Sequence, residues 1–259
     1  MEEVSIKEWQ DILLDEACVF HDICVKHNIP YYMLGGTMLG AIRHQGFIPW
    51  DDDMDFGVMQ EDFVKLRDIL KKELPSNYQI RDEKNIDFYY GRQVKIENIK
   101  TISIRRNNKG DQLGAFIDIF PLVRTNGKKN LFSRNGLISF LLKLQYYRFC
   151  TYKTRKKKTI SLIVKIFMFW LKQGLLSNIV IKYLEKDKGD FIVNYWGAWI
   201  NKELVHHSIM GTPKLYKFEN KKLYGVEKPE EYLKSLYGDY MKIPQDHSCH
   251  LSKMYIKHP

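Results

Sequence analysis

The stretch GGTMLGAIRHQGFIPWDDDMDFGV, residues 35–58, decides the fold and holds the most unusual chemistry of the chain. It contains four aspartates in five positions, Asp51, Asp52, Asp53 and Asp55, among glycine and apolar residues. Clustered carboxylates repel one another, and their burial is unfavourable unless a positive charge lies among them. Period-two alternation puts Asp53 and Asp55 on one face of a strand and apolar side chains on the other. The stretch therefore predicts a strand with one acidic face.

Two glycines open the same stretch. Gly35 and Gly36 let the backbone turn and approach a ligand closely, because neither carries a Cβ atom. Thr37 is a suitable N-cap for a short helix, MLGAIRHQ, which Gly46 would end. The first N–H groups of a helix are free to donate to an anion. This segment is therefore predicted to bind phosphate.

Three explanations of the aspartates differ in what balances their charge. A solvated acidic surface conflicts with the Trp, Phe and Ile residues around them. A calcium-binding EF-hand is excluded, because the loop positions that need Gly and Glu hold Phe56 and Asp62. The third explanation is a phosphate-transfer site in which Asp53 and Asp55 bind Mg²⁺ or Mn²⁺. Asp118, a lone charge inside the apolar run GAFIDIFPLV, is then the expected third carboxylate.

The rest of the chain alternates between helical and strand-like patterns. Apolar residues recur at helical spacing over 6–27, behind a capping box that starts at Ser5, and a second helix is expected over 60–73. We predict an α+β fold, a mixed β-sheet flanked by helices, followed by a mainly helical, basic region. The expected strands are 31–34, 53–58, 78–82, 88–96, 101–106 and 114–123. The expected parts are a catalytic core over 1–125, a basic helical subdomain over 126–190, and a C-terminal segment over 191–259 that packs on the core.

The positive charge of the chain is concentrated in its middle. The net charge is +10, and residues 121–190 alone carry 16 basic and 3 acidic side chains. Two helix-like runs, 131–150 and 160–176, are joined by a basic segment that is expected to be a linker. The second run has two lysines and is too short for a spanning helix, so it is either a membrane-interface helix beside the basic residues 153–158 or a core helix with exposed lysines.

Other features of the sequence indicate the expected cellular location and partners of the protein. The acidic start MEEVSIKEWQ lacks the pattern of a signal peptide, and the four cysteines have neither metal-binding nor disulfide-dense spacing. We therefore expect a cytoplasmic protein, with peripheral contact to the inner face of the cytoplasmic membrane through 153–176. No nucleic-acid-binding motif is found, so nucleic acid is not an expected partner.

Three segments resemble the signature blocks of one family. LGGTMLGAIRHQGFIPWDDDMDFGV, FIDIFPL (116–122) and YLKSLYGDYMKIP (232–244) are similar to the LicD family of bacterial phosphocholine transferases, which is related to fukutin and fukutin-related protein. The resemblance implies a nucleotidyltransferase-like fold. It also implies transfer of a phospho-alcohol, with CDP-choline as the best-known donor type and CMP as product, to a hydroxyl of a cell-surface glycan such as teichoic acid, lipopolysaccharide or capsule. A lipid-linked acceptor would account for the membrane-interface helix.

The resemblance also assigns roles to single residues. Asp53 and Asp55 would bind the metal, Asp51 would be a ligand or its support, and Asp118 would be a third ligand or the base for the acceptor hydroxyl. The expected substrate-binding residues are Gly35, Gly36, Thr37, Arg43, His44 and Lys95.

The assignments of Arg43, His44 and Lys95 to substrate binding each leave an alternative open. Arg43 is expected to meet a phosphate or a carboxylate, whereas His44 is equally consistent with a packed histidine. Lys95 either reaches the donor phosphates or is a solvent-facing strand lysine. Two other functions are considered: a DxD-type glycosyltransferase, against which the glycine pair argues, and a catalytically inactive membrane-associated scaffold, against which the aspartates argue.

Overall fold

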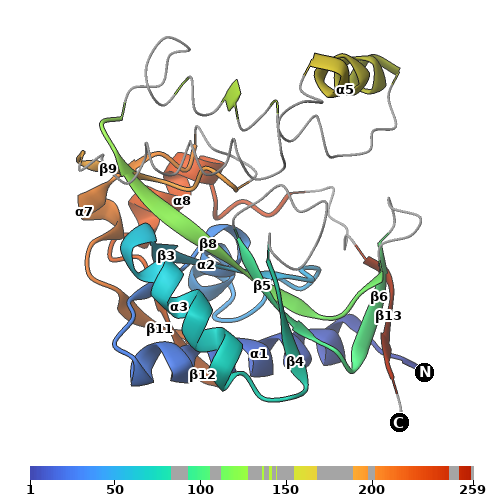
Figure 1. Cartoon of the computed structure of the whole chain (residues 1–259). Coiled ribbons are helices and arrows are strands. Elements are labelled where there is room, and N and C mark those ends of the chain that lie inside the picture. Colours follow the sequence, from blue (N-terminus) through green and yellow to red (C-terminus); the bar gives the residue numbers. More distant parts are fainter. Residues whose placement is uncertain are drawn as a thin grey trace. The chain divides into compact units, whose positions relative to one another are not determined.

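The computed structural model describes residues 1–82, 93–105, 112–127, 136, 140–141, 144, 155–167, 189–197, 202–244 and 251–257 (Figure 1). The chain divides into two compact units. The first contains residues 1–81, 93–121 and 208–259, and the second contains residues 82–92 and 122–207. The predicted site residues all belong to the first unit.

Helix α1 (Ile6–Lys26) begins where the sequence predicts. The Ser5 side chain accepts a hydrogen bond from the Glu8 backbone N–H at 3.2 Å, and the Glu8 carboxylate accepts one from the Ser5 N–H at 2.7 Å. This reciprocal capping box satisfies N–H groups that a helix start leaves free. The buried face of α1 is apolar apart from Gln10 and Glu16, and its fully buried side chains include Trp9, Leu13 and Phe20. The periodicity therefore predicted both the helix and its core face.

A mixed β-sheet forms the centre of the first unit. Its strands follow the order β8-β3-β2-β12-β11, and β4 and β5 extend it beside β8. Strands β2 and β3 are antiparallel, whereas β12 runs parallel to β2, so the sheet mixes both pairings. The strands are β2 (Tyr31–Met33), β3 (Met54–Met59), β4 (Tyr78–Arg81), β5 (Val94–Asn98), β8 (Phe116–Thr125), β11 (Lys214–Phe218) and β12 (Lys221–Gly225).

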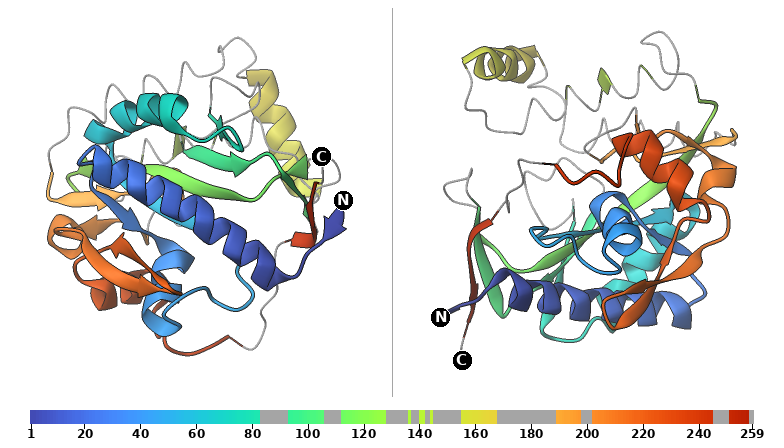
Figure 2. Two further views of the ribbon diagram at one scale, coloured as in Figure 1. Left: turned by 90° about the horizontal axis from the view of Figure 1, so that it is seen from below. Right: turned by 180° about the vertical axis from the view of Figure 1, so that it is seen from behind.

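Helices pack against this sheet in two groups. Helix α3 (Gln60–Glu73) packs against α1, β3 and β4, and α1 also packs against β5. Helix α2 (Gly35–Arg43) packs against β3, β11 and α8 (Pro229–Tyr237). The view from below shows α1 running along the strands, and the view from behind shows α2 beside α8 (Figure 2). The C-terminal segment thus brings α8 next to the glycine turn at the start of α2.

A smaller antiparallel sheet of the first unit joins the two ends of the described chain. It has the order β1-β13-β6-β7, and β1 pairs with β13 from Glu2↔Ile256 to Glu3↔Tyr255. The sequence predicted only β6 among these strands. The members are β1 (Glu2–Glu3), β6 (Thr101–Arg105), β7 (Gln112–Leu113) and β13 (Leu251–Ile256).

The second unit contains a short antiparallel sheet and a basic helix. The end of β8 pairs with β9 (Phe191–Val193), and β9 pairs with β10 (Val205–His206), which leads into α7 (His207–Met210). Helix α5 (Arg155–Phe167) starts within the basic run, so the prediction that this run is a linker is wrong: its lysines lie in the helix. The predicted helix over 131–150 lies almost entirely outside the described residues, as does the part of 160–176 beyond Phe167.

These elements confirm the predicted α+β class with a mixed sheet flanked by helices. The three-part division at residues 125 and 190 stays a prediction. Among the described residues, no helix has the length and apolar character needed to cross a bilayer.

Candidate active site

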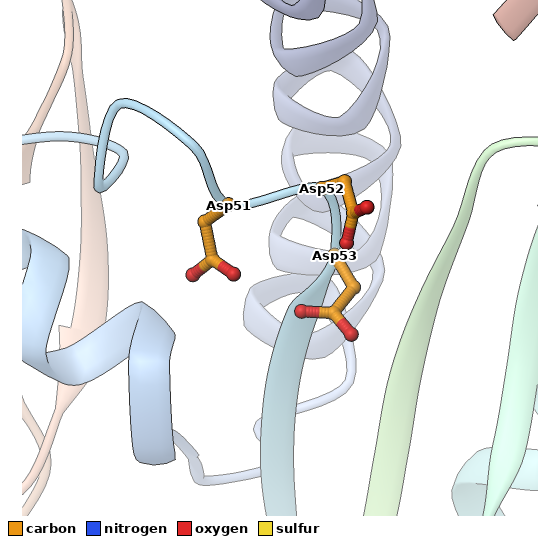
Figure 3. Close-up of side chains that lie close together, drawn as sticks. All are labelled: Asp51, Asp52 and Asp53. Carbon is orange, nitrogen blue, oxygen red and sulfur yellow. The ribbon is translucent and has the colours of Figure 1, made fainter. Parts of the chain in front are cut away.

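Three consecutive aspartates form the centre of the candidate site. Asp51, Asp52 and Asp53 lie in the loop that leads into β3, and each offers a carboxylate oxygen within 4.8 Å of the others (Figure 3). Strand alternation continued back from Asp53 would point the Asp52 side chain to the opposite face, away from this group. Because β3 begins only at Met54, strand alternation does not govern the three residues before it. Asp52 is buried and belongs to the cluster.

Asp55 and Asp118 extend the cluster onto the sheet. Asp55 lies on β3 and Asp118 on the neighbouring strand β8. Burial, together with repulsion from Asp53, Asp118 and Asp51, holds the pKa of Asp55 well above its usual range, and only Lys95 opposes this rise. The structure therefore brings together all four predicted metal-site carboxylates.

The repulsion at Asp51 shows how strongly the site favours a cation. Burial, followed by the charges of Asp53 and Asp52, raises the pKa of Asp51 to about 8. A divalent cation would relieve both costs, because it replaces lost water and balances the negative charge. Hard cations such as Mg²⁺ prefer carboxylate oxygen ligands, so the donor set fits the expected metal.

Lys95 brings a positive charge to this site. Its Nζ atom donates to both carboxylate oxygens of Asp118 at 2.6 Å and lies 3.7 Å from the centre of the Phe116 ring. The pairing follows from register, since Lys95 of β5 stands opposite Asp118 of β8. The lysine side chain is only 13% exposed, so the structure contradicts the alternative that it is a solvent-facing strand lysine.

The glycine turn lies directly against the acidic cluster. A Cβ atom on Gly36 would stand 2.9 Å from Oδ2 of Asp51, and one on Gly35 would stand 3.6 Å from Oδ2 of Asp55. Gly35 also has a φ of +48°, a conformation that favours glycine. At Gly36 the lack of a side chain leaves room for the Asp51 carboxylate, whereas at Gly35 the backbone conformation is what favours glycine. The two segments quoted from the sequence thus meet in space.

The prediction that Thr37 caps the following helix is wrong. Helix α2 already begins at Gly35, and its N-cap residue is Leu34. Thr37 lies in the first turn, where its hydroxyl accepts a hydrogen bond from the Asp55 N–H at 2.8 Å. The threonine therefore ties the start of α2 to the acidic strand β3.

Arg43 and His44 lie at the other end of α2. The Arg43 Nε donates to His44 Nε2 at 2.9 Å, and its Nη1 donates to the Tyr240 carbonyl at 2.8 Å. Burial and the adjacent guanidinium lower the pKa of His44, which fits a neutral imidazole that accepts this hydrogen bond. Their predicted contacts with substrate stay predictions.

Four residues near the site were not among the predicted site residues, although Tyr232 and Tyr237 lie in the 232–244 block that resembles the LicD family. Tyr232 of α8 accepts a hydrogen bond from the Gly35 N–H at 3.1 Å, and the Tyr237 hydroxyl lies 3.6 Å from the position of a Gly35 Cβ. Trp9 and Gln10 of α1 donate to the backbone of the aspartate loop. These contacts join segments distant in the sequence, so no local pattern reveals them.

Comparison with known proteins gives a consistent result. Residues 28–155 match the family described as "LicD/FKTN/FKRP, nucleotidyltransferase domain". The lipopolysaccharide cholinephosphotransferase LicD of Haemophilus influenzae is 30% identical over 275 aligned residues, which cover 99% of this chain and 100% of that protein. The mouse ribitol 5-phosphate transferase FKRP is 29% identical over 100 residues, 39% of this chain and 18% of its own.

A solved structure gives a much weaker similarity. Terminal uridylyl transferase 4 from Trypanosoma brucei with bound GTP aligns with 64% of this chain and 54% of its own, at 12% identity. Its TM-score of 0.25 is too low to carry an argument about the fold.

Proposed function

Since the chain belongs to the LicD family, we propose that it transfers phosphocholine from CDP-choline to a hydroxyl of a cell-surface glycan and releases CMP. The relatives named above transfer phosphocholine or ribitol 5-phosphate, so the coarse activity is that of a phosphotransferase acting on phospho-alcohols. Teichoic acid, lipopolysaccharide and capsule are the proposed acceptor classes. CDP-choline is the proposed donor because the relative that aligns over its full length is a cholinephosphotransferase.

One observation carries the proposal: helix α2 begins with two glycines, and these glycines face a cluster of carboxylates. A Cβ atom on Gly36 would stand 2.9 Å from Oδ2 of Asp51, so the backbone of α2 lies next to the acidic loop. We assign Gly35, Gly36 and Thr37 to the donor phosphates, since N–H groups at a helix start attract anions. Phosphoryl transfer depends mainly on positioning and charge neutralisation, and both are available here.

The aspartates are assigned to the metal. Asp53, Asp55 and Asp51 would hold Mg²⁺ or Mn²⁺, and the cluster geometry adds Asp52 as a ligand or close support. When bound, the cation would neutralise donor phosphate charge and make the phosphorus easier to attack. The carboxylates would hold the cation, and the adjacent glycine turn would bind the donor phosphates.

Asp118 and Lys95 are assigned to the acceptor side of the reaction. Asp118 would take the proton of the attacking hydroxyl or complete the metal site, and its charge is balanced by Lys95 at 2.6 Å. Lys95 can exchange this partner for a donor phosphate during the reaction. Arg43 and His44 are proposed to contact the substrate at the far end of α2.

A donor panel tests the proposal directly. The full chain is incubated with Mg²⁺ and CDP-choline, CDP-ethanolamine, CDP-glycerol or CDP-ribitol, and CMP release is measured with and without a glycan acceptor. We expect release from CDP-choline, faster with acceptor and abolished by EDTA. Release from another CDP-alcohol instead would keep the reaction class and change the substrate. Turnover of a sugar nucleotide alone would support the glycosyltransferase alternative. Inertness toward every donor in the presence of Mg²⁺, together with absence of metal binding, would support the inactive scaffold.

We also propose that the acceptor is lipid-linked and that α5 contacts the inner face of the cytoplasmic membrane. Three apolar side chains of this helix, Leu162, Ile163 and Ile166, are 59%, 49% and 59% exposed, whereas Ser161 and Val164 are buried. The exposed side is thus more apolar than a solvated helix surface requires. A core helix would place these residues inside, so the exposure supports the membrane-interface alternative.

The charge of α5 suits an anionic bilayer. Lys158 and Lys165 are exposed on the same helix as the apolar side chains, and the sequence adds basic residues before them. Basic residues beside an apolar face favour anionic headgroups. Co-sedimentation with vesicles of phosphatidylcholine and phosphatidylglycerol should be lost when Ile163 and Ile166 are both changed to Ser. Val25→Ser, at an exposed apolar position of α1, is the matched control and should leave binding unchanged.

A further inference from the structure

The aspartate loop lacks the support that a helix or strand would give it. Residues 51–53 lie between α2 and β3 and belong to no regular element. Metal ligands must nevertheless be held to within about 0.5 Å of their working positions. Mutual repulsion of the carboxylates acts against such order. Some contact from outside the loop must therefore hold it in place.

Helix α1 supplies that contact through two neighbouring residues. The side-chain amide of Gln10 donates to the Asp51 carbonyl at 2.9 Å and to the Ile48 carbonyl at 3.1 Å. The indole N–H of Trp9 donates to the Asp52 carbonyl at 3.3 Å. Gln10 is 4% and Trp9 1% exposed, so water does not compete for these hydrogen bonds.

The two carbonyls are those that decide the direction of the aspartate side chains. The Asp51 carbonyl belongs to the peptide unit between Asp51 and Asp52, and the Asp52 carbonyl belongs to the unit between Asp52 and Asp53. Peptide units are planar, so fixing both carbonyls fixes the orientation of the backbone on each side of Asp52. The Cα–Cβ bond of Asp52 is thereby fixed. Asp51 is also held on its other side, where its N–H donates to the Ile48 carbonyl at 2.9 Å, and Asp53 leads directly into β3.

We propose that Gln10 is a positioning residue of the metal site, which holds Asp51–Asp53 in ligating geometry through their backbone, with Trp9 as its partner. The proposal rests on the proposed function, because it takes the aspartates as metal ligands. Gln10 touches neither metal nor substrate. Its effect is on metal affinity, through the two peptide units that it and Trp9 hold.

The test compares Mn²⁺ affinity with fold stability. Calorimetric titration of the full chain with Mn²⁺ gives the Kd, and thermal unfolding gives Tm. Gln10→Met keeps side-chain length and apolar contact but cannot donate. We expect its Mn²⁺ Kd to rise by about 10–100-fold, the range for residues that orient metal ligands. Ile23→Ala, a buried position on the same helix, is the matched control for lost stability.

The outcomes separate the two proposals. A Gln10→Met chain that loses affinity while Ile23→Ala loses Tm but binds Mn²⁺ like the wild type supports the positioning role. Equal Mn²⁺ affinity of Gln10→Met and wild type overturns that role and leaves the proposed function intact. A parallel loss of Tm and affinity in both variants also overturns it, since Gln10 would then act only through stability. A wild-type chain that binds no Mn²⁺ overturns the metal assignment itself.

Discussion

Two sets of buried carboxylates in the first unit have opposite electrostatic surroundings. Glu97 on β5 is almost fully buried, and its oxygens accept hydrogen bonds from Arg81, Gln79 and the Gly114 N–H. The aspartate loop, by contrast, gathers carboxylates whose repulsion raises the pKa of Asp51 to about 8. The charge of Glu97 is balanced by Arg81 and by hydrogen bonds, whereas the aspartates lie close together and repel one another.

The difference separates an acid that supports the fold from acids that are proposed to bind a metal. Glu97 joins two strands and a turn, so its charge supports the fold. The aspartates raise the free energy of the fold and keep a place in which a cation is favourable. Carboxylates whose pKa is raised by burial and mutual repulsion therefore mark the candidate site better than burial alone.

The largest expected effect is the loss of turnover when the aspartates are changed. Asp53→Asn and Asp55→Asn should each lower turnover of the nucleotide donor by about 10³-fold or more, the scale of losing a group that stabilises developing charge. Thermal stability should stay equal or rise, because repulsion is relieved. Tm and CMP release are measured on the same samples. Unchanged turnover in both variants would remove these residues from the mechanism.

Replacement of Glu97 should lower the stability of the fold and leave metal binding unchanged. Glu97→Ala leaves Arg81 and the Gly114 N–H without their acceptor, and we expect a loss of about 2–3 kcal/mol in the free energy of unfolding. This lies below the range for a fully buried ion pair, since the Arg81 side chain is 30% exposed. Urea unfolding measures the loss. Mn²⁺ affinity of the folded fraction should not change, and a large change would contradict the structural role.

The sequence predicted one of these two regions well and the other hardly at all. The acidic run, the glycine pair and the lone charge of Asp118 are local signals, and strand pairing brought them together as expected. The Thr37 cap was misplaced because glycine itself starts the helix. Glu97 and Gln10 gave no signal, because their partners are 16 to 41 residues away in the chain.

A smaller effect on turnover is expected from Gly36→Ala. The added Cβ would stand 2.9 Å from Asp51 Oδ2, so the carboxylate must shift by a few tenths of an ångström. We expect turnover to fall by about tenfold, less than a full 1 Å displacement would cause, with Tm nearly unchanged. Gly40→Ala on the same helix is the contrasting control. Its Cβ would meet the Gly46 carbonyl, so it should lower Tm instead. Equal turnover of Gly36→Ala and wild type would argue against close backbone contact at the site.

Glu16 of α1 is a third kind of buried carboxylate and should give the smallest effect. It is fully buried, neither oxygen has a hydrogen-bond partner among the residues that the structure describes, and burial and the charge of Glu97 raise its pKa. A raised pKa in the folded state means that the stability contributed by the neutral acid is complete below the unfolded pKa and is lost as pH rises toward the folded value.

Glu16→Gln cannot ionise, so its Tm should exceed that of wild type by a few degrees at pH 8 and by less at pH 5. Glu61→Gln, an exposed position on α3, should show no such pH-dependent difference. If wild type and Glu16→Gln lose Tm in parallel between pH 5 and pH 8, Glu16 is not the uncompensated acid that its burial indicates, and the contrast with Glu97 reduces to hydrogen bonding alone.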